Sequence, residues 1–112
     1  KDFTFEAAHK LPLVPNSHKC SKLHGHSFKI RISVEDELND LGWVIDYADI
    51  KSACGPVIEV LDHSYLNEVP GLDNPTSENI AVWLWNEIQP KLAILSEIEV
   101  KETCNTGCIY RG

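Results

Sequence analysis

The chain has 112 residues, of which 43% are hydrophobic and 24% are charged. This length and composition are typical of one folded domain over residues 1–112 and exclude a disordered chain. Acidic residues outnumber basic ones by 17 to 10, giving a formal net charge of −7, which argues against a nucleic-acid-binding surface because phosphate binding needs a basic face. Any anionic ligand must therefore be held by a local cationic patch.

The sequence also indicates the cellular compartment of the protein. It contains no apolar run near the ~20 residues that span a bilayer and no leader-like segment at its start, so we expect a cytoplasmic protein. The first residue is Lys1 rather than Met, and we expect the native start to lie upstream. In the cytoplasm, thiols serve as reduced side chains, metal ligands or nucleophiles rather than in disulfides. The cysteines are Cys20, Cys54, Cys104 and Cys108.

Two predicted strands come first. Side chains in a strand alternate between its faces, so residues 1–10 place Phe3, Phe5, Ala7 and His9 on one face, and residues 24–35 do the same with His24, His26, Phe28, Ile30, Ile32 and Val34. In both strands the apolar row continues into histidines. About 14 residues separate the strands, more than the two to five of an ordinary hairpin, and long loops in compact domains tend to be functional. Cys20 lies in that loop.

Two helices are predicted next. After a turn, residues 43–45 can extend a strand, and Asp46 is a suitable N-cap for a helix that reaches residue 61, where Gly55 and Pro56 predict a kink or a late start. The second helix begins at Thr76 or Ser77 and ends at Pro90.

The chain ends with two further predicted strands. Residues 96–103 alternate again, with Glu102 in the apolar row after Ile98 and Val100, and a turn over 104–108 leads into a short last strand. The order predicts an α+β fold, with an antiparallel four-stranded sheet and two helices inserted between strands 2 and 3.

The histidines suggest a metal site. His24 and His26 lie on one side of their strand, about 6.6 Å apart at Cα, so both rings can reach one ion. His9 can supply a third nitrogen if the two strands pair around the loop. Three neutral histidines and one open position are typical of catalytic zinc. The alternative is that the histidines are unrelated polar residues, although burying three beside an apolar row is costly unless something satisfies them.

Cys20 allows two interpretations. As a fourth ligand it closes a Cys-His₃ site, and the protein is then a zinc-stabilised structural or binding module. As a free thiol beside a cation it favours the thiolate and can act as a base or nucleophile. The spacing C-x₃-H-x-H leaves both possibilities open.

Two carboxylates complete the candidate site. Asp62 precedes His63, and a carboxylate beside a histidine stabilises the imidazolium and orients the ring for proton transfer; the alternative is an ordinary helix end. Glu102 can accept two parallel N–H bonds from an amidine-like heterocycle; the alternative is a salt bridge or a strand end in solvent.

Together these positions resemble the 6-pyruvoyltetrahydropterin synthase / 6-carboxytetrahydropterin synthase family. The resemblance spans nearly the whole chain and is carried by motifs in one order: "FTFEAAH", "CSKLHGHSF", "GWVIDYADIK", "LDHSYLN", "NPTSENIA" and "VKETCNTGCIYRG". The last motif is most similar to the bacterial carboxy branch of the queuosine pathway.

The resemblance implies a T-fold, in which subunits form trimeric barrels, often stacked as hexamers, with active sites between subunits. It implies zinc ligands at His9, His24 and His26, a catalytic thiol at Cys20, an Asp62–His63 proton relay and a pterin anchor at Glu102. We also expect cations near the metal to hold a triphosphate; the candidates are His18, Lys19 and Lys22.

The implied reaction converts 7,8-dihydroneopterin triphosphate into 6-carboxy-5,6,7,8-tetrahydropterin, releasing acetaldehyde and triphosphate. The pyruvoyl branch keeps the carbon chain but uses the same zinc, thiol and relay, so the residues do not separate the two products. The residues also leave open a closed zinc module or a different T-fold pterin enzyme, such as a dihydroneopterin aldolase or a cyclohydrolase relative.

Overall fold

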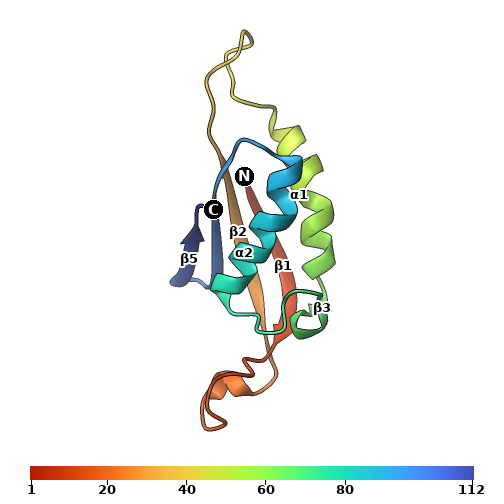
Figure 1. Ribbon diagram of the computed structural model, residues 1–112, viewed down its shortest axis with the longest axis vertical. Coiled ribbons are helices and arrows are strands. Elements are labelled where there is room, and N and C mark those ends of the chain that lie inside the picture. Colours follow the sequence, from red (N-terminus) through yellow and green to blue (C-terminus); the bar gives the residue numbers. More distant parts are fainter.

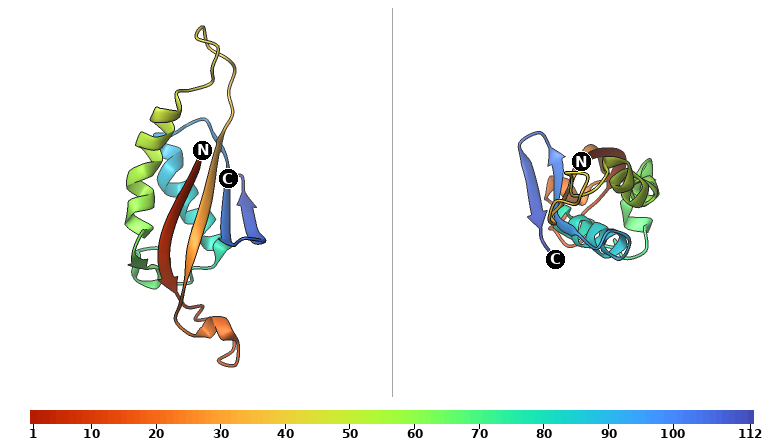
Figure 2. Two further views of the ribbon diagram at one scale, coloured as in Figure 1. Left: turned by 180° about the vertical axis from the view of Figure 1, so that it is seen from behind. Right: turned by 90° about the horizontal axis from the view of Figure 1, so that it is seen from above.

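A five-stranded sheet carries both helices on one of its faces (Figure 1). The computed structural model describes residues 1–112. Its strands are β1 (Asp2–His9), β2 (His24–Val34), β3 (Ser64–Tyr65), β4 (Leu95–Thr103) and β5 (Thr106–Tyr110), and its helices are α1 (Tyr47–Leu61) and α2 (Ser77–Ile88). Short 3₁₀ turns cover Lys19–Ser21, Leu66–Glu68 and Gln89–Lys91. Seen from behind, the opposite face of the sheet is free of helices (Figure 2).

The strand order β3-β1-β2-β4-β5 corrects the expected sheet. The α+β class is confirmed, but the sheet has five strands and is mixed rather than four-stranded and antiparallel, because β3 pairs with β1 in parallel through Ala7↔Ser64 and Ala8↔Tyr65. β3 also separates the two helices along the chain. Two residues are too few to show an alternating pattern, so the sequence contained no signal for this strand.

The core lies between the sheet and the helices. β1 and β2 pair antiparallel from Asp2↔Arg31 to His9↔His24. Phe5 and Phe28 lie opposite each other in this pairing, and their buried rings stack with centroids 4.8 Å apart. The apolar rows of the two strands therefore pack under the helices as predicted, and the histidines at the strand ends are carried to the same edge of the core.

Both helices begin at the predicted caps. The Asp46 side chain accepts a hydrogen bond from the N–H of Ala48, and the Thr76 side chain accepts one from the N–H of Asn79. α1 continues through Pro56 without a break. Buried residues both before and after this proline, such as Cys54 and Leu61, pack against the core, and this packing offsets the lost hydrogen bond.

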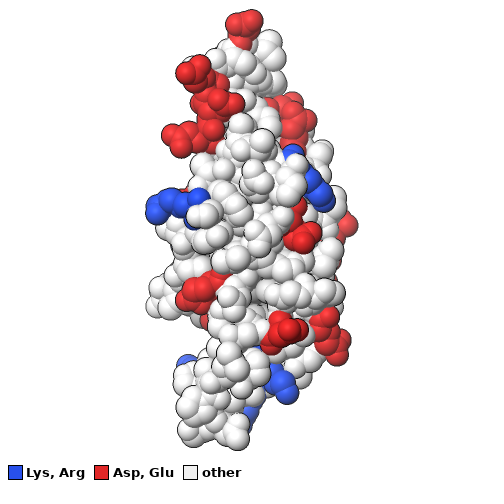
Figure 3. All heavy atoms as spheres, viewed as in Figure 1, with Lys and Arg blue, Asp and Glu red and all other residues white.

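Two loops project from opposite ends of the sheet (Figure 1). One is residues 10–23, between β1 and β2. The other is residues 35–46, which contain no strand at 43–45; the N–H of Asn39 instead donates to the carbonyl of Trp43 in a turn. Acidic side chains gather on this second loop, at the top of Figure 3, whereas residues 10–23 contain three lysines and no acidic residue. None of the helices is both long enough and apolar enough to cross a membrane.

Candidate functional site

Three histidines meet where β1 ends and β2 begins. His9 is the last residue of β1 and pairs with His24, the first residue of β2, while His26 follows two positions later on the same face. The ring centroids are 4.6 Å apart for His9 and His24, 5.2 Å for His9 and His26, and 4.9 Å for His24 and His26. The pairing of the two strands thus brings together the three rings that strand parity had placed on one face.

Backbone carbonyls orient two of these rings. His9 Nδ1 lies 2.8 Å from the Pro75 carbonyl, and His24 Nδ1 lies 2.7 Å from the Lys22 carbonyl. A carbonyl only accepts, so each Nδ1 carries the proton and each Nε2 of a neutral ring presents its lone pair. This arrangement is typical of histidines that bind a metal through Nε2.

The site has polar atoms that lack partners. The Nε2 atoms of His9 and His26 are buried and have no hydrogen-bond partner. Burial lowers the pKa of both rings, more than the nearby Glu102 carboxylate raises it, so the neutral form that a metal requires is favoured. One nitrogen from each histidine and one oxygen from Glu102 lie within 4.8 Å of one another. These residues fit a metal ion, and three nitrogens with a carboxylate oxygen suit zinc.

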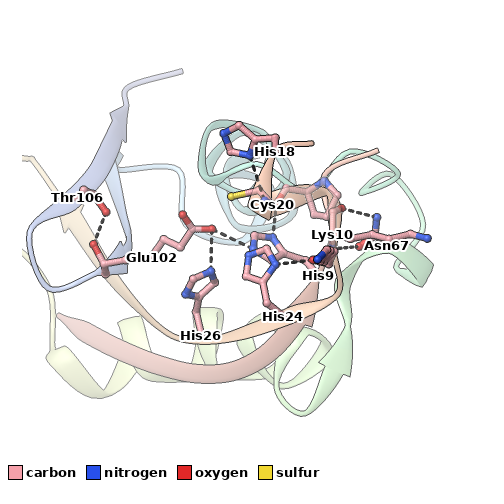
Figure 4. Close-up of polar contacts among 12 residues, drawn as sticks. His9, Lys10, His18, Cys20, His24, His26, Asn67, Glu102 and Thr106 are labelled. Atoms are coloured by element: carbon pink, nitrogen blue, oxygen red, sulfur yellow. Dashed lines mark hydrogen bonds and ion pairs between the residues drawn. The ribbon is translucent and has the colours of Figure 1, made fainter. Parts of the chain in front are cut away.

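Glu102 reaches the histidines from β4 (Figure 4). Its Oε1 lies 3.0 Å from His9 Nε2 and 3.3 Å from His26 Nε2. In the pairing with β5, Lys101 faces Gly107 and Thr103 faces Thr106, so Glu102 is the extra residue of a bulge, a feature that re-aims side chains. A Cβ at Gly107 would lie 2.7 Å from the Val100 carbonyl oxygen, so only glycine fits opposite the bulge.

Cys20 lies in the 3₁₀ turn of the loop over this cluster. Its backbone N–H donates to His18 Nδ1 over 3.1 Å, and its carbonyl accepts from the N–H of Leu11 over 2.8 Å, which closes the base of the loop. Cys20 lines a hollow of about 410 Å³ together with Lys19, His24, Gly25, His26, Glu102 and Thr103. The thiol therefore opens onto the same space as the metal cluster.

A second hollow adjoins the first at Glu102. It measures about 220 Å³ and is lined by Leu11, Thr76, Ser77, Glu78, Glu102, Thr106 and Gly107. Most of these residues belong to the start of α2, the end of β4 and the start of β5. Glu102 thus borders both the space beside the histidines and this second, mostly polar space.

Asp62 and His63 lie elsewhere in the chain. One Asp62 oxygen accepts from the N–H of Glu6 over 2.9 Å and the other lies 2.9 Å from His63 Nδ1. These contacts, the Glu6 bond first, lower the pKa of Asp62. His63 adopts a positive φ of 55° and its side chain is 80% exposed. It lines a separate hollow of about 470 Å³ with Glu6, Ala7, Ala8, Gly25, His26, Ser27 and Ser64.

Comparison with known proteins connects this arrangement to a family. Residues 1–112 match the family described as 6-pyruvoyl tetrahydropterin synthase. The chain belongs to this family. The resemblance noted in the sequence is thereby confirmed.

Members of the family and a solved structure show how far the similarity extends. A 6-carboxy-5,6,7,8-tetrahydropterin synthase from Synechocystis sp. is 41% identical over 117 residues, covering 98% of this chain and 89% of that protein. A dihydroneopterin monophosphate aldolase from Pyrococcus furiosus is 37% identical over 89 residues, covering 80% of this chain and 72% of that protein. The structure of Caenorhabditis elegans 6-pyruvoyl tetrahydropterin synthase superposes with a TM-score of 0.89 at 24% identity, covering 100% of this chain and 92% of that chain. This similarity confirms the T-fold.

Within one chain, the fold joins most of the predicted site residues but not all of them. His9, His24, His26, Glu102 and Cys20 share one region, whereas Asp62 and His63 line a different hollow from Cys20. Of the three residues expected to hold a triphosphate, Lys19 lines the hollow beside Cys20, His18 accepts from the Cys20 backbone, and Lys22 orients His24 through its carbonyl.

Two contributions to the site were not predicted from the sequence. The carbonyls of Pro75 and Lys22 are backbone groups, so side-chain patterns contain no signal for them. The residues of the second hollow around Thr76 and Thr106 lie in the motifs "NPTSENIA" and "VKETCNTGCIYRG". These motifs had carried the resemblance, but only Glu102 among them had been given a role.

Proposed function

We propose that the protein is a zinc-dependent lyase that converts 7,8-dihydroneopterin triphosphate into 6-carboxy-5,6,7,8-tetrahydropterin, releasing acetaldehyde and triphosphate, as a step toward queuosine. The observation that carries the proposal is the single hollow lined by Cys20, His24, His26 and Glu102. The 41% identity to a 6-carboxytetrahydropterin synthase supports the carboxy product.

His9, His24 and His26 would hold the zinc ion through Nε2. Bound zinc supplies Lewis-acid chemistry, which polarises substrate hydroxyl groups and acidifies the attached C–H bonds. The hydrogen bonds from the rings to the Pro75 and Lys22 carbonyls fix the two rings in the orientation that this binding needs.

The remaining steps belong to side chains of the protein. Cys20, as the thiolate, removes a proton from a carbon of the substrate side chain. His63 moves protons to and from the substrate, and Asp62 orients its ring through Nδ1, which leaves Nε2 for exchange. Glu102 accepts two N–H bonds from the pterin ring. Triphosphate then leaves by elimination, and tautomerisation of the side chain reduces the ring without a nicotinamide cofactor. One water molecule then adds to the side-chain carbonyl next to the ring, and the neighbouring C–C bond breaks. This step leaves the carboxyl group on the ring and releases the other two carbons as acetaldehyde.

The separation of His63 from Cys20 within one chain supports a site shared between copies. We propose a homo-oligomer, a trimer or a hexamer of two trimers, in which His63 of one copy faces Cys20 of another. The sheet has two free edges for such assembly: β5 on one side and, on the other, the part of β1 before Ala7 that β3 leaves unpaired. Free edges readily pair with another chain.

The triphosphate needs local positive charge because the protein is acidic overall. Lys19 lines the Cys20 hollow, and His18 and Lys22 flank it in a loop without acidic residues. We propose these three residues as its contacts. All four cysteines are free, and a mechanism that uses a free thiol fits the reducing cytoplasm.

The deciding experiment is incubation of the zinc-loaded protein with 7,8-dihydroneopterin triphosphate. We expect acetaldehyde and 6-carboxytetrahydropterin in equal amounts. Cys20→Ala should remove this activity, whereas Cys104→Ala, which truncates an exposed thiol in the β4–β5 turn, should keep it. Loss of triphosphate without acetaldehyde would instead identify the pyruvoyl reaction.

The Pyrococcus relative favours one further candidate, an aldolase that acts on dihydroneopterin or its monophosphate. Release of glycolaldehyde from that substrate would support it, and formate would indicate a cyclohydrolase-type reaction. A closed zinc module predicts no turnover on any of these pterins. X-ray absorption would then detect sulfur bound to zinc in the resting protein.

A further inference from the structure

The ion pairs of Glu102 are with imidazole nitrogens alone. Its Oε1 lies 3.0 Å from His9 Nε2 and 3.3 Å from His26 Nε2, and no lysine or arginine forms an ion pair with it. No backbone N–H donates to the carboxylate, and 28% of its side chain is exposed. A carboxylate that is mostly withdrawn from water is costly without a cation.

The neighbouring nitrogens strengthen the requirement for a cation. The Nδ1 atom of His9 donates to the Pro75 carbonyl, so the neutral ring turns a lone pair at Nε2 toward the carboxylate oxygen. Two acceptors at this distance repel each other unless a proton or a metal ion lies between them.

The separations match a shared ion. Ligand atoms bound tetrahedrally at ~2.0–2.1 Å from zinc are about 3.3 Å apart. The observed distances from Glu102 Oε1 to the two Nε2 atoms are 3.0 Å and 3.3 Å. The carboxylate oxygen therefore occupies a position that a fourth ligand would take, beside three histidines that already converge.

We propose that Glu102 is the fourth ligand of the metal in the substrate-free protein and leaves it to bind the ring of the substrate. Glu102 stands at a bulge and lines the second hollow as well as the one beside the histidines, which gives its side chain two spaces to occupy. One binding event would then anchor the ring and open a coordination position. The second half of this proposal, the exchange, rests on the proposed function; the first half does not.

The resting ligand can be tested without any pterin. Metal-free protein is titrated with Zn²⁺ against a chromophoric chelator, and the Co²⁺-loaded protein is examined for its visible absorption bands. Glu102→Gln, which keeps the shape but weakens the ligand, should lower Zn²⁺ affinity at least about tenfold and change the Co²⁺ bands. Glu99→Gln, on the same strand beside Lys101, should change neither.

Equal Zn²⁺ affinity and identical Co²⁺ bands in the wild type and Glu102→Gln would overturn the proposal. Thermal unfolding of the metal-free variants shows whether they are folded. The exchange is tested with 7,8-dihydropterin, which has the ring but no side-chain hydroxyls that could replace Glu102. Its binding should change the Co²⁺ bands of the wild type, and unchanged bands with the ring bound would refute the exchange. If the ring does not bind at all, the proposed function fails while the affinity difference stands.

Discussion

Removal of the metal is expected to destabilise the fold, because the site leaves buried polar atoms unpaired. The Nε2 atoms of His9 and His26 have no hydrogen-bond partner, and the His9 side chain is 0% exposed. The metal-free protein therefore retains a cost that the metal-bound protein does not have.

The size of the effect follows from these two atoms. A buried unsatisfied polar group costs about 1–3 kcal/mol, so the two Nε2 atoms together cost about 2–6 kcal/mol. The unfolding entropy of a chain of 112 residues is about 0.24 kcal/mol/K near the unfolding midpoint. The midpoint Tm should therefore fall by roughly 8–25 °C when the metal is removed.

The assay is differential scanning calorimetry of the zinc-loaded and chelator-treated protein at one protein concentration. His26→Ala should lose most of the difference in Tm between the two samples, because it removes a ligand. His63→Ala alters a histidine that lines a different hollow and should keep the full difference. If the wild type unfolds at the same temperature with and without zinc, the three histidines do not form a metal site.

The remaining predictions concern the thiol, the relay and pH. Cys20→Ala should keep Zn²⁺ affinity and Tm but lower kcat at least about a hundredfold; loss of zinc would show that the thiol is a ligand. Asp62→Asn should lower kcat about ten- to a hundredfold in steady-state kinetics with little change in KM, since it orients His63 rather than the substrate; an unchanged kcat would contradict the relay. Burial lowers the pKa of His9 and His26 in the folded state. As the pH falls below about 6.5, the unfolded chain therefore binds more protons than the folded chain. The Tm of the metal-free protein should fall over that range. A flat profile between about pH 7.5 and 5 would refute this assignment.

Strand parity accounts for most of what the sequence could predict about the site. The alternation in β1 and β2 placed His9, His24 and His26 on the buried face before any pairing was known, because a shift of one residue would have exposed the whole apolar row. The same reasoning placed Glu102 inward on β4. The helix caps at Asp46 and Thr76 could also be predicted from the sequence, since cap residues act on the backbone next to them.

What the sequence missed depends on partners far along the chain. β3 is a strand only because Ser64 and Tyr65 meet β1, and the approach of Glu102 to the histidines depends on the bulge opposite Gly107. The placement of Asp62 and His63 away from Cys20 depends on how α1 returns to Glu6 at the sheet edge. Local patterns do not encode these long-range pairings.

The hydrogen bond from the Leu11 N–H to the Cys20 carbonyl separates the loop into a fixed base and a free tip. The carbonyls of Pro15 and Asn16 accept hydrogen bonds from the His18 N–H and the Ser21 hydroxyl, so the tip that lies beyond these contacts is residues 12–14. The Cys20 turn itself is capped locally by His18. The length of the tip is thereby decoupled from the position of the thiol. Doubling a flexible loop costs only about 0.6 kcal/mol in closure entropy, so the tip can accept inserted segments, including a tag or a fluorophore attachment site, while Cys20 stays over the metal cluster.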